Sequence, residues 1–226
     1  MKAILLFSGG LDSTTLLADL LAPPDTKEVL CLSASYGSNH NEQERKHQEA
    51  IIHFYRSIRR DKRVLHELLT LPNLWEGSGS ALMGEAEVPV LAYADGPQPT
   101  VVPFRNGVLI AAAVAIAASR GYSDVFIAAH ASDAANYAYP DCTPDFLIPM
   151  RAAVYVGTMK AVRLINPYVN ATKVDVVSRG LRNKAPLHLT YSCYRGGEKP
   201  CGHCATCLER MGAFAANGVK DPVEYE

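Results

Sequence analysis

The order of apolar and polar positions along the chain predicts strands and helices in alternation. Short apolar runs with the length of buried strands occur at residues 2–7, 29–34, 64–69, 124–129 and 162–165. Apolar residues recur at helical spacing in residues 13–21, 41–58, 108–119, 145–160, 172–182 and 205–216. Such alternation is typical of a parallel sheet with helices on both faces, so we expect a Rossmann-like, doubly wound α/β fold.

One long stretch departs from this order. Residues 72–103 are rich in glycine and proline and show no periodic pattern. A segment of this length without secondary structure of its own is uncommon in a compact domain. We therefore predict either a functional loop, such as a lid over a binding site, or a disordered segment.

Composition narrows the classes of protein that fit this pattern. The 226 residues carry 22 Lys and Arg against 23 Asp and Glu, so the net charge is 22 − 23 = −1, which argues against a broad nucleic-acid-binding surface. No apolar run reaches the ~18 residues of a membrane span. The apolar start at residues 1–7 is short for a signal peptide and lacks a small-residue cleavage site. We expect a cytoplasmic protein that binds neither membranes nor, stably, nucleic acid.

A loop containing two glycines joins the first predicted strand to the first predicted helix. It reads Ser8-Gly9-Gly10-Leu11-Asp12-Ser13-Thr14. In open α/β sheets, ligands bind beyond the carboxyl ends of the strands, where loop amides and the start of a helix attract anions. The loop matches neither the dinucleotide pattern nor the Walker A pattern. At this point a phosphate-binding loop and a plain tight turn, with Asp12 capping the helix, both fit.

Four of the six cysteines are crowded near the carboxyl end of the chain, at Cys193, Cys201, Cys204 and Cys207. A reducing cytosol disfavours disulfides, and four thiolates match the tetrahedral preference of zinc. Because four protein ligands leave no open position for a substrate, we predict a structural site with one zinc ion per chain. His203 offers a substitute ligand. An iron–sulfur cluster, a redox pair and a zinc module that binds nucleic acid remain as alternatives.

Two motifs at opposite ends of the chain together resemble a known family. Ser-Gly-Gly-x-Asp-Ser at a strand–helix junction resembles the PP-loop of the ATP pyrophosphatase superfamily, which has a Rossmann-like fold of the adenine nucleotide alpha hydrolase type. Combined with the cysteine cluster, it resembles the 7-cyano-7-deazaguanine synthase (QueC) family of queuosine precursor biosynthesis. Intermediate motifs that support the resemblance are Tyr36-Gly37 with His40, Val102-Pro103-Phe104-Arg105-Asn106, Tyr139-Pro140-Asp141-Cys142 and Thr172-Lys173. We place a PP-loop domain at residues 1–185 and a small zinc-binding subdomain at residues 186–226.

The resemblance implies a function. In the family, one ATP adenylates the carboxylate of 7-carboxy-7-deazaguanine, ammonia displaces AMP to give an amide, and a second ATP drives dehydration to the nitrile (preQ0). The residues that the resemblance places at ATP, with magnesium on its phosphates, are Ser8, Gly9, Gly10, Asp12, Ser13, Thr14 and Tyr36. Those that it places at the deazaguanine are Arg105, Asn106, Tyr139 and Asp141. The expected catalytic residues are Asp12, Ser13, Lys173 and Arg105. The resemblance also implies a homodimer.

Several of these assignments have a purely structural alternative. Asn106 fits a helix cap, Asp141 a turn residue and Lys173 a solvated side chain. His130 and Asp133 follow the fourth predicted strand, on the expected ligand side, but match the family pattern poorly.

Departures from the family's usual pattern keep a second function open. The family usually has Gln-Arg where this chain has Ser38-Asn39, and glycine at Phe104 and at Ala138; it usually has Arg at Thr143. The acyl acceptor is affected more than the ATP site. The alternative is a divergent QueC-like ligase of the antiphage defence type, which joins the activated carboxylate through an amide to another amine, such as one on a partner protein. A tRNA-thiolating PP-loop enzyme fits the net charge and the distant cysteine cluster less well.

Overall fold

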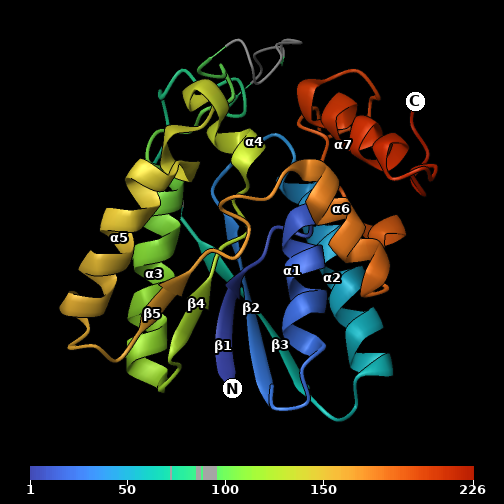
Figure 1. The fold of residues 1–226 in the computed structure, drawn as a ribbon. Helices are drawn as coiled ribbons and strands as arrows, with labels where there is room; N and C mark the ends of the chain where they lie inside the picture. The colour runs from blue at the N-terminus through green and yellow to red at the C-terminus, as the bar shows by residue number, and fades with distance from the viewer. Residues whose placement is uncertain (72, 85–87, 89–95) are drawn as a thin grey trace.

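A parallel sheet forms the centre of the molecule (Figure 1). The computed structural model describes residues 1–71, 73–84, 88 and 96–226. In this part of the chain the five strands lie in the order β3-β2-β1-β4-β5, all parallel. They are β1 (Lys2–Leu6), β2 (Glu28–Ser35), β3 (Arg63–Thr70), β4 (Asp124–Phe126) and β5 (Arg163–Ile165). The chain builds outward from β1 to β3 on one side and then crosses to β4 and β5, so the switch point of the topology lies beside β1.

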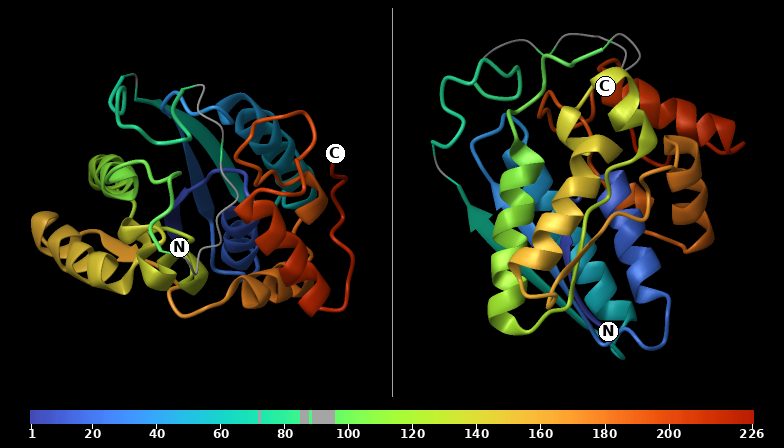
Figure 2. Two further views of the ribbon diagram at one scale, coloured as in Figure 1. Left: turned by 90° about the horizontal axis from the view of Figure 1, so that it is seen from above. Right: turned by 60° about the vertical axis from the view of Figure 1, so that its left-hand side comes forward.

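Helices cover both faces of the sheet (Figures 1 and 2). On one face lie α1 (Leu11–Leu21), α2 (Asn41–Ile58) and α6 (Lys173–Arg182), with α7 (Ala205–Ala216) packed on α6 at the carboxyl edge of the sheet. On the other face lie α3 (Arg105–Arg120) and α5 (Pro144–Gly157). The short helix α4 (Ala131–Ala134) follows β4, and single 3₁₀ turns occupy Ala135–Tyr137, Pro140–Cys142 and Leu187–Leu189.

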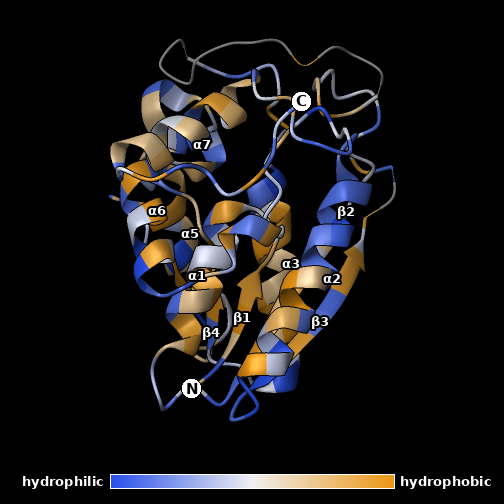
Figure 3. Ribbon diagram, turned by 90° about the vertical axis from the view of Figure 1, so that its right-hand side faces the viewer, coloured by the Kyte–Doolittle hydropathy of each residue, from blue (hydrophilic) through white to orange (hydrophobic). Residues whose placement is uncertain are grey.

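Alternate residues of each strand point into two separate cores. Leu5 of β1 packs against the helices of the α1 face, whereas its neighbour Ile4 packs against α3, and both are fully buried. Small residues such as Ala113 on α3 let that helix lie close to the strands. In Figure 3 the amino-terminal half of α2 is coloured as hydrophilic, and the exposed residues Glu42, Arg45 and Lys46 lie in this half.

The structure confirms the predicted doubly wound α/β fold and shifts some boundaries. The strand predicted at residues 124–129 ends at Phe126, because its neighbour β5 ends at Ile165, just before Pro167. The helix predicted at residues 145–160 ends at Gly157, and the chain then turns through positive φ at Met159 and Lys160. Within the described residues, no helix is long and apolar enough to cross a membrane. The domain boundary after residue 185 stays a prediction.

A third cluster joins the carboxyl-terminal region to the long loop. Trp75 and Leu82 of that loop are buried together with Tyr36 and the four clustered cysteines. The indole Nε1 of Trp75 donates a hydrogen bond to the carbonyl of Pro103 at 2.7 Å. The described parts of residues 72–103 therefore pack against the protein. The predicted lid also includes residues 72, 85–87 and 89–95, which lie outside the described residues.

A buried ion pair attaches the end of the chain to α7. Arg210 is almost fully buried, and its Nε and Nη2 donate to the carboxylate of Asp221 at 2.7 and 3.0 Å. Nη1 also donates to Oγ1 of Thr190, and Nη2 also donates to the carbonyl of Leu187. Because these hydrogen bonds fix the guanidinium between the two segments, the pair stabilises α7 against the preceding segment.

We expect Asp221→Asn to lower the free energy of unfolding by about 3 kcal/mol, because it leaves the charge of Arg210 buried and unpaired. Denaturant unfolding measures this change. Glu224→Gln breaks the exposed pair of Glu224 with Lys199 and is the matched control, expected to leave the unfolding midpoint unchanged. Equal behaviour of the two variants would contradict a structural role for the buried pair.

Candidate active site

The predicted site residues converge on a cavity of about 220 Å³ at the carboxyl edge of the sheet. Those in its described lining are Ser8, Gly10, Asp12, Ser13, Tyr36, Arg105, Asn106, Tyr139 and Lys173. Gly9, Thr14 and Asp141 lie outside the described lining. This position follows from the topology, because the carboxyl ends of parallel strands meet at one edge of the sheet and leave a crevice at the switch point.

The loop after β1 leaves the start of α1 free to bind an anion. The helix begins at Leu11 directly after Gly10, which as a glycine has no side chain to cap it, and no side chain in the described part of the chain is recorded as accepting from its first amides. Gly9 has φ of 76°, and a Cβ there would lie 2.9 Å from Cγ of Gln48, so this tight turn requires glycine. Gln48 of α2 in turn donates to the carbonyl of Ser8 at 3.0 Å. Exposed amides with the positive end of a helix dipole are typical of phosphate sites.

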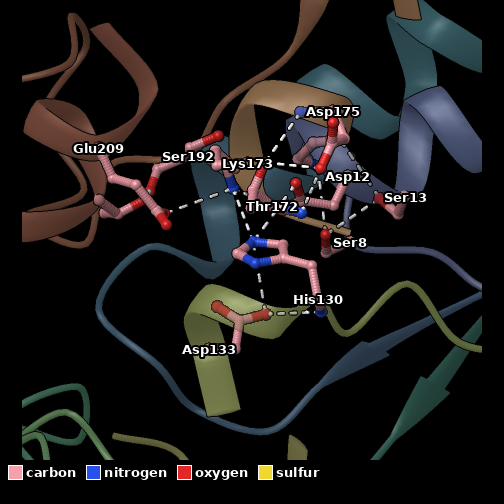
Figure 4. Close-up of polar contacts among 12 residues, drawn as sticks. Ser8, Asp12, Ser13, His130, Asp133, Thr172, Lys173, Asp175, Ser192 and Glu209 are labelled. Atoms are coloured by element: carbon pink, nitrogen blue, oxygen red, sulfur yellow. Dashed lines mark hydrogen bonds and ion pairs between the residues drawn. The ribbon is translucent and has the colours of Figure 1, made fainter. Parts of the chain in front are cut away.

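Asp12 does not cap α1 but binds a buried lysine (Figure 4). Nζ of Lys173, the first residue of α6, donates to Oδ2 of Asp12 at 2.8 Å and lies 3.2 Å from Nε2 of His130. It also lies 3.7 Å from a carboxylate oxygen of Glu209 on α7. Thr172 caps α6 through its Oγ1, which accepts from the third residue of the helix. The cap thereby sets the direction in which Lys173 enters the cavity.

The opposite charges in this cluster keep one another ionised despite their burial. Burial alone would lower the pKa of Lys173, but the carboxylates of Asp12, Glu209 and Asp133 raise it, so the ammonium stays protonated. Burial would raise the pKa of Asp12, yet Lys173 and His130 lower it overall. Among the described residues, Oδ1 of Asp12 and Oε2 of Glu209 are buried without a hydrogen-bond partner. The cluster therefore has acceptors available for a further donor or cation.

Residues on α3 form another wall of the cavity. Nη1 of Arg105 donates to the hydroxyl of Tyr36 at 3.1 Å, and its guanidinium carbon lies 5.9 Å from the centre of that ring. Asp141 accepts hydrogen bonds from the backbone N–H of Asn106 at 2.7 Å and from its Nδ2 at 3.2 Å. Asp141, and not Asn106, therefore caps α3, and it also orients the Asn106 side chain. The turn after Pro140 thus supplies the cap of a helix that lies 35 residues earlier in the sequence.

Phe104 takes a backbone conformation that favours glycine. It immediately precedes α3 and has φ of 55°, in the left-handed region. Its ring lies over Gly107, where a Cβ would come within 2.3 Å of it, and it meets Phe146 edge-on at 5.5 Å. The left-handed conformation gives a physical reason for the glycine usual in the family pattern at this position.

A second pair of largely buried polar side chains, His40 and Glu44, borders the cavity at the start of α2. His40 belongs to a motif found in the sequence, whereas Glu44 was not predicted. Nε2 of His40 lies 3.6 Å from Oε1 of Glu44. Burial, partly offset by Arg105, raises the pKa of Glu44 to about 8. Burial and the charge of Arg105 lower the pKa of His40 to about 4. Both side chains are thus driven towards their neutral forms in the absence of a ligand.

The four clustered cysteines fit a tetrahedral metal site. All are buried, and their Sγ atoms lie within 4.8 Å of one another. The Sγ atoms of Cys193 and Cys204 are 4.0 Å apart, close to the ~3.8 Å edge of a tetrahedron with Zn–S distances of about 2.3 Å. The backbone N–H groups of Cys201 and Arg195 point at Sγ of Cys193, both at 3.4 Å, which favours the thiolate form. The residues present can therefore hold a structural metal.

The sequence patterns gave only a weak signal for His130 and Asp133, and none for Glu209, which all belong to the Lys173 cluster. His130 and Asp133 were expected on the ligand side and do join the Lys173 cluster, with 3.5 Å between Nε2 and Oδ2. Glu209 carried no signal of its own, although it lies two residues after Cys207 in the helix that the cysteine cluster begins. Burial raises the pKa of Cys142, so its thiol stays protonated, in agreement with the apolar role predicted for it.

The raised pKa of Glu44 predicts a stability that falls with pH. Because its folded pKa is about 8 against an ordinary value of 4.5, the folded state binds the proton more tightly, and stability is lost as pH rises from about 4.5 to 8. We expect Glu44→Gln to raise the free energy of unfolding on the order of 2 kcal/mol at pH 8 and to have little effect at pH 4.5.

Thermal unfolding at both pH values measures this difference. Glu42→Gln, at an exposed position on the same helix, is the matched control and should show no such dependence on pH. A variant at Glu44 that is less stable than the wild type at pH 8 would contradict the raised pKa.

Comparison with known proteins places this site in a family. Residues 2–218 match the family model described as queuosine biosynthesis protein QueC. The chain is similar to a 7-cyano-7-deazaguanine synthase from Archaeoglobus fulgidus, 41% identical over 226 residues that cover 99% of this chain and 90% of the relative. It is also similar to synthases of that name from Caldicellulosiruptor bescii, 38% identical with 100% and 98% covered, and from a Chelativorans species, 38% identical with 100% and 94% covered.

These matches confirm the resemblance drawn from the sequence motifs, and they lend no support to the divergent amide-forming ligase. They extend from the loop after β1 to the cysteine cluster, so they include both walls of the cavity. The chain belongs to the QueC family of queuosine biosynthesis proteins.

Proposed function

We propose that the chain is an ATP-dependent synthase that converts 7-carboxy-7-deazaguanine and ammonia to 7-cyano-7-deazaguanine. The observation that carries the proposal is that the uncapped start of α1, the buried Lys173 and Arg105 of α3 all border one cavity. Relatives that match the whole chain bear the name of that synthase. The reaction needs a carboxylate held in line with the α-phosphorus of ATP.

The loop after β1 is suited to the phosphates of ATP. The amides at the start of α1 and the hydroxyls of Ser8 and Ser13, 3.1 Å apart, offer donors to phosphate oxygens. Lys173 supplies a fixed positive charge in a nearly dry position, where it stabilises the charge that develops on the leaving pyrophosphate. Its carboxylate partner Asp12 holds it in place before ATP arrives.

Magnesium fits the acceptors that the Lys173 cluster leaves open. The buried Oδ1 of Asp12 has no hydrogen-bond partner among the described residues, and carboxylate oxygens are the ligands that this ion prefers. When bound, magnesium would neutralise charge on the phosphate oxygens. Asp12 thereby has two roles: its Oδ2 accepts a hydrogen bond from Lys173, and its Oδ1 is available to bind the magnesium ion.

The deazaguanine is proposed to lie against α3. Arg105, Asn106 and Tyr139 border the cavity, and Asp141 holds Asn106 from behind. The hydroxyl of Tyr139 is hydrogen-bonded to that of Thr100 at 2.7 Å, which fixes the ring. Trp75 of the long loop packs against Tyr36 at the border of the cavity. We propose that the loop thereby limits the entry of water, which would hydrolyse a reactive acyl adenylate. The homodimer that the resemblance implies stays a prediction, as does a cytoplasmic location.

The reaction products test the proposal. The chain is incubated with 7-carboxy-7-deazaguanine, ATP and ammonium, and the products are read by mass spectrometry. We expect the nitrile and AMP, and we expect Lys173→Met to slow pyrophosphate release on the order of 100-fold or more, because a cation at the developing charge is lost. Lys199→Met, at an exposed lysine, is the control.

Each other outcome of that assay is informative. Accumulation of the amide, or inertness until a protein amine is supplied, would favour the divergent ligase over the synthase. Unchanged pyrophosphate release by a folded Lys173→Met variant would remove the lysine from the chemistry.

We further propose one zinc ion per chain at the cysteine cluster. Metal analysis of the purified protein should give one equivalent of zinc, and Cys204→Ser should lower both the zinc content and the melting temperature, because three thiolates bind the ion less tightly. Cys31→Ser, at an isolated buried cysteine of β2, is the control and should keep its zinc. Iron with a visible absorbance band would instead establish an iron–sulfur cluster.

A further inference from the structure

Glu44 borders the cavity, but the proposed chemistry gives it no part. It lies in the first turn of α2, where its backbone N–H donates to the carbonyl of His40 at 2.9 Å. Its side chain is 16% exposed. Among the described residues its carboxylate accepts no hydrogen bond, and its nearest recorded partner is Nε2 of His40 at 3.6 Å. The carboxylate is therefore largely buried at the border of the cavity, where an occupant can supply the hydrogen bonds that it lacks.

This arrangement is unfavourable for the protein without a ligand. Taking a carboxylate out of water without hydrogen bonds destabilises the folded state, and His40 beside it is itself buried with an Nδ1 that has no partner in the described structure. Glu42, two residues earlier on the same helix, lies in solvent and pairs with Lys46 at 3.2 Å. The burial of Glu44 is thus a property of its position towards the cavity and not of this helix turn in general.

The chemistry of the neighbours indicates what the carboxylate receives. The positive charge of Arg105 acts on both Glu44 and His40, so a carboxylate acceptor and a guanidinium donor lie in the same region of the cavity. The six-membered ring of a guanine-type base presents two N–H donors, at N1 and at the 2-amino group, beside a carbonyl acceptor. A carboxylate matches the two donors and a guanidinium matches the carbonyl.

We infer that Glu44 recognises the guanine-type edge of the substrate, accepting hydrogen bonds from N1–H and from the 2-amino group of the deazapurine. This inference rests on the proposed function. The edge lies at the end of the bicyclic ring remote from the ring that carries the carboxylate. The substrate then has its 2-amino end at Glu44 on α2 and its carboxylate towards Lys173 and the loop after β1, all of which border the same cavity.

Glu44 is a specificity-determining residue in this arrangement. Burial raises the pKa of Glu44 in the free protein, and the two N–H donors provide the hydrogen bonds that its ionised carboxylate lacks there. A guanine-type ring therefore gains more binding energy than a ring lacking the 2-amino group, which offers N1–H alone. An analogue without that group leaves the buried carboxylate partly unpaired. A buried carboxylate could also bind the ammonium ion that the proposed reaction consumes. The test therefore distinguishes recognition of the 2-amino group from binding of ammonium.

The experiment compares two free bases, 7-deazaguanine and 7-deazahypoxanthine, which differ only in the 2-amino group. Their binding to the full chain is measured by calorimetry, which requires no turnover. We expect the wild type to prefer 7-deazaguanine by about 10- to 100-fold, the range for a hydrogen bond to a charged group. Glu44→Gln should lose most of this preference, because it weakens 7-deazaguanine, which offers two N–H donors, more than 7-deazahypoxanthine, which offers N1–H alone. Glu42→Gln should retain the preference.

Turnover with 7-carboxy-7-deazaguanine and its 2-deamino analogue extends the test. The same loss of preference is expected in kcat/KM, with the KM for ammonium unchanged. Equal weakening of both bases by Glu44→Gln, or a preserved preference with a raised KM for ammonium, would overturn the inference; the latter would assign Glu44 to the ammonium ion. Absence of turnover in the wild type would contradict the proposed synthase and not the base preference, which the binding measurement decides.

Discussion

The partly buried ion pair between Asp12 and Lys173 is the interaction on which the site depends. It joins residues 161 positions apart, one in the first turn of α1, directly after the glycine loop, and the other at the start of α6. Glu209 adds α7 to the same ammonium group. A charge pair in this setting stabilises the fold only if its geometry is retained, because removing either partner leaves the other buried and uncompensated. The position of the loop, of α6 and of α7 is therefore set by the same contacts that prepare the cavity for an anion.

The cysteine cluster is best understood as support for this arrangement. It lies at the start of α7, and Cys193 itself borders the cavity, so a metal bound there would order both the cavity wall and the helix that presents Glu209. With four protein ligands it has no position free for a substrate. Arg210 and Asp221 add a second attachment on the same helix. Residues near the carboxyl end of the chain thus help to position Lys173 and Asp12, through Glu209 of α7.

Stability and function are in tension at the start of α2. Glu44 and His40 are both held in conditions that disfavour their charged forms, and Phe104 before α3 is held in a left-handed conformation. Unfavourable features of this kind persist where the surrounding structure enforces them, and they concentrate at binding sites. Glu44 and His40 border the cavity, and Phe104 directly precedes Arg105, which also borders it. The apolar cores on the two sheet faces, by contrast, show the ordinary packing of a doubly wound fold.

The sequence by itself determined the features that depend on local pattern. Periodicity located α2 at Asn41–Ile58 and α7 at Ala205–Ala216, and the spacing of Gly9 with Asp12 located the loop. Cysteines a few residues apart indicated a metal site, since neighbours in sequence are neighbours in space. Only the tertiary structure decided the rest: that Asp141 caps α3, that Glu209 reaches Lys173, and that Glu44 faces the cavity. Those contacts join separate elements, and no local pattern encodes which side chains meet when parallel strands bring their carboxyl ends to one edge.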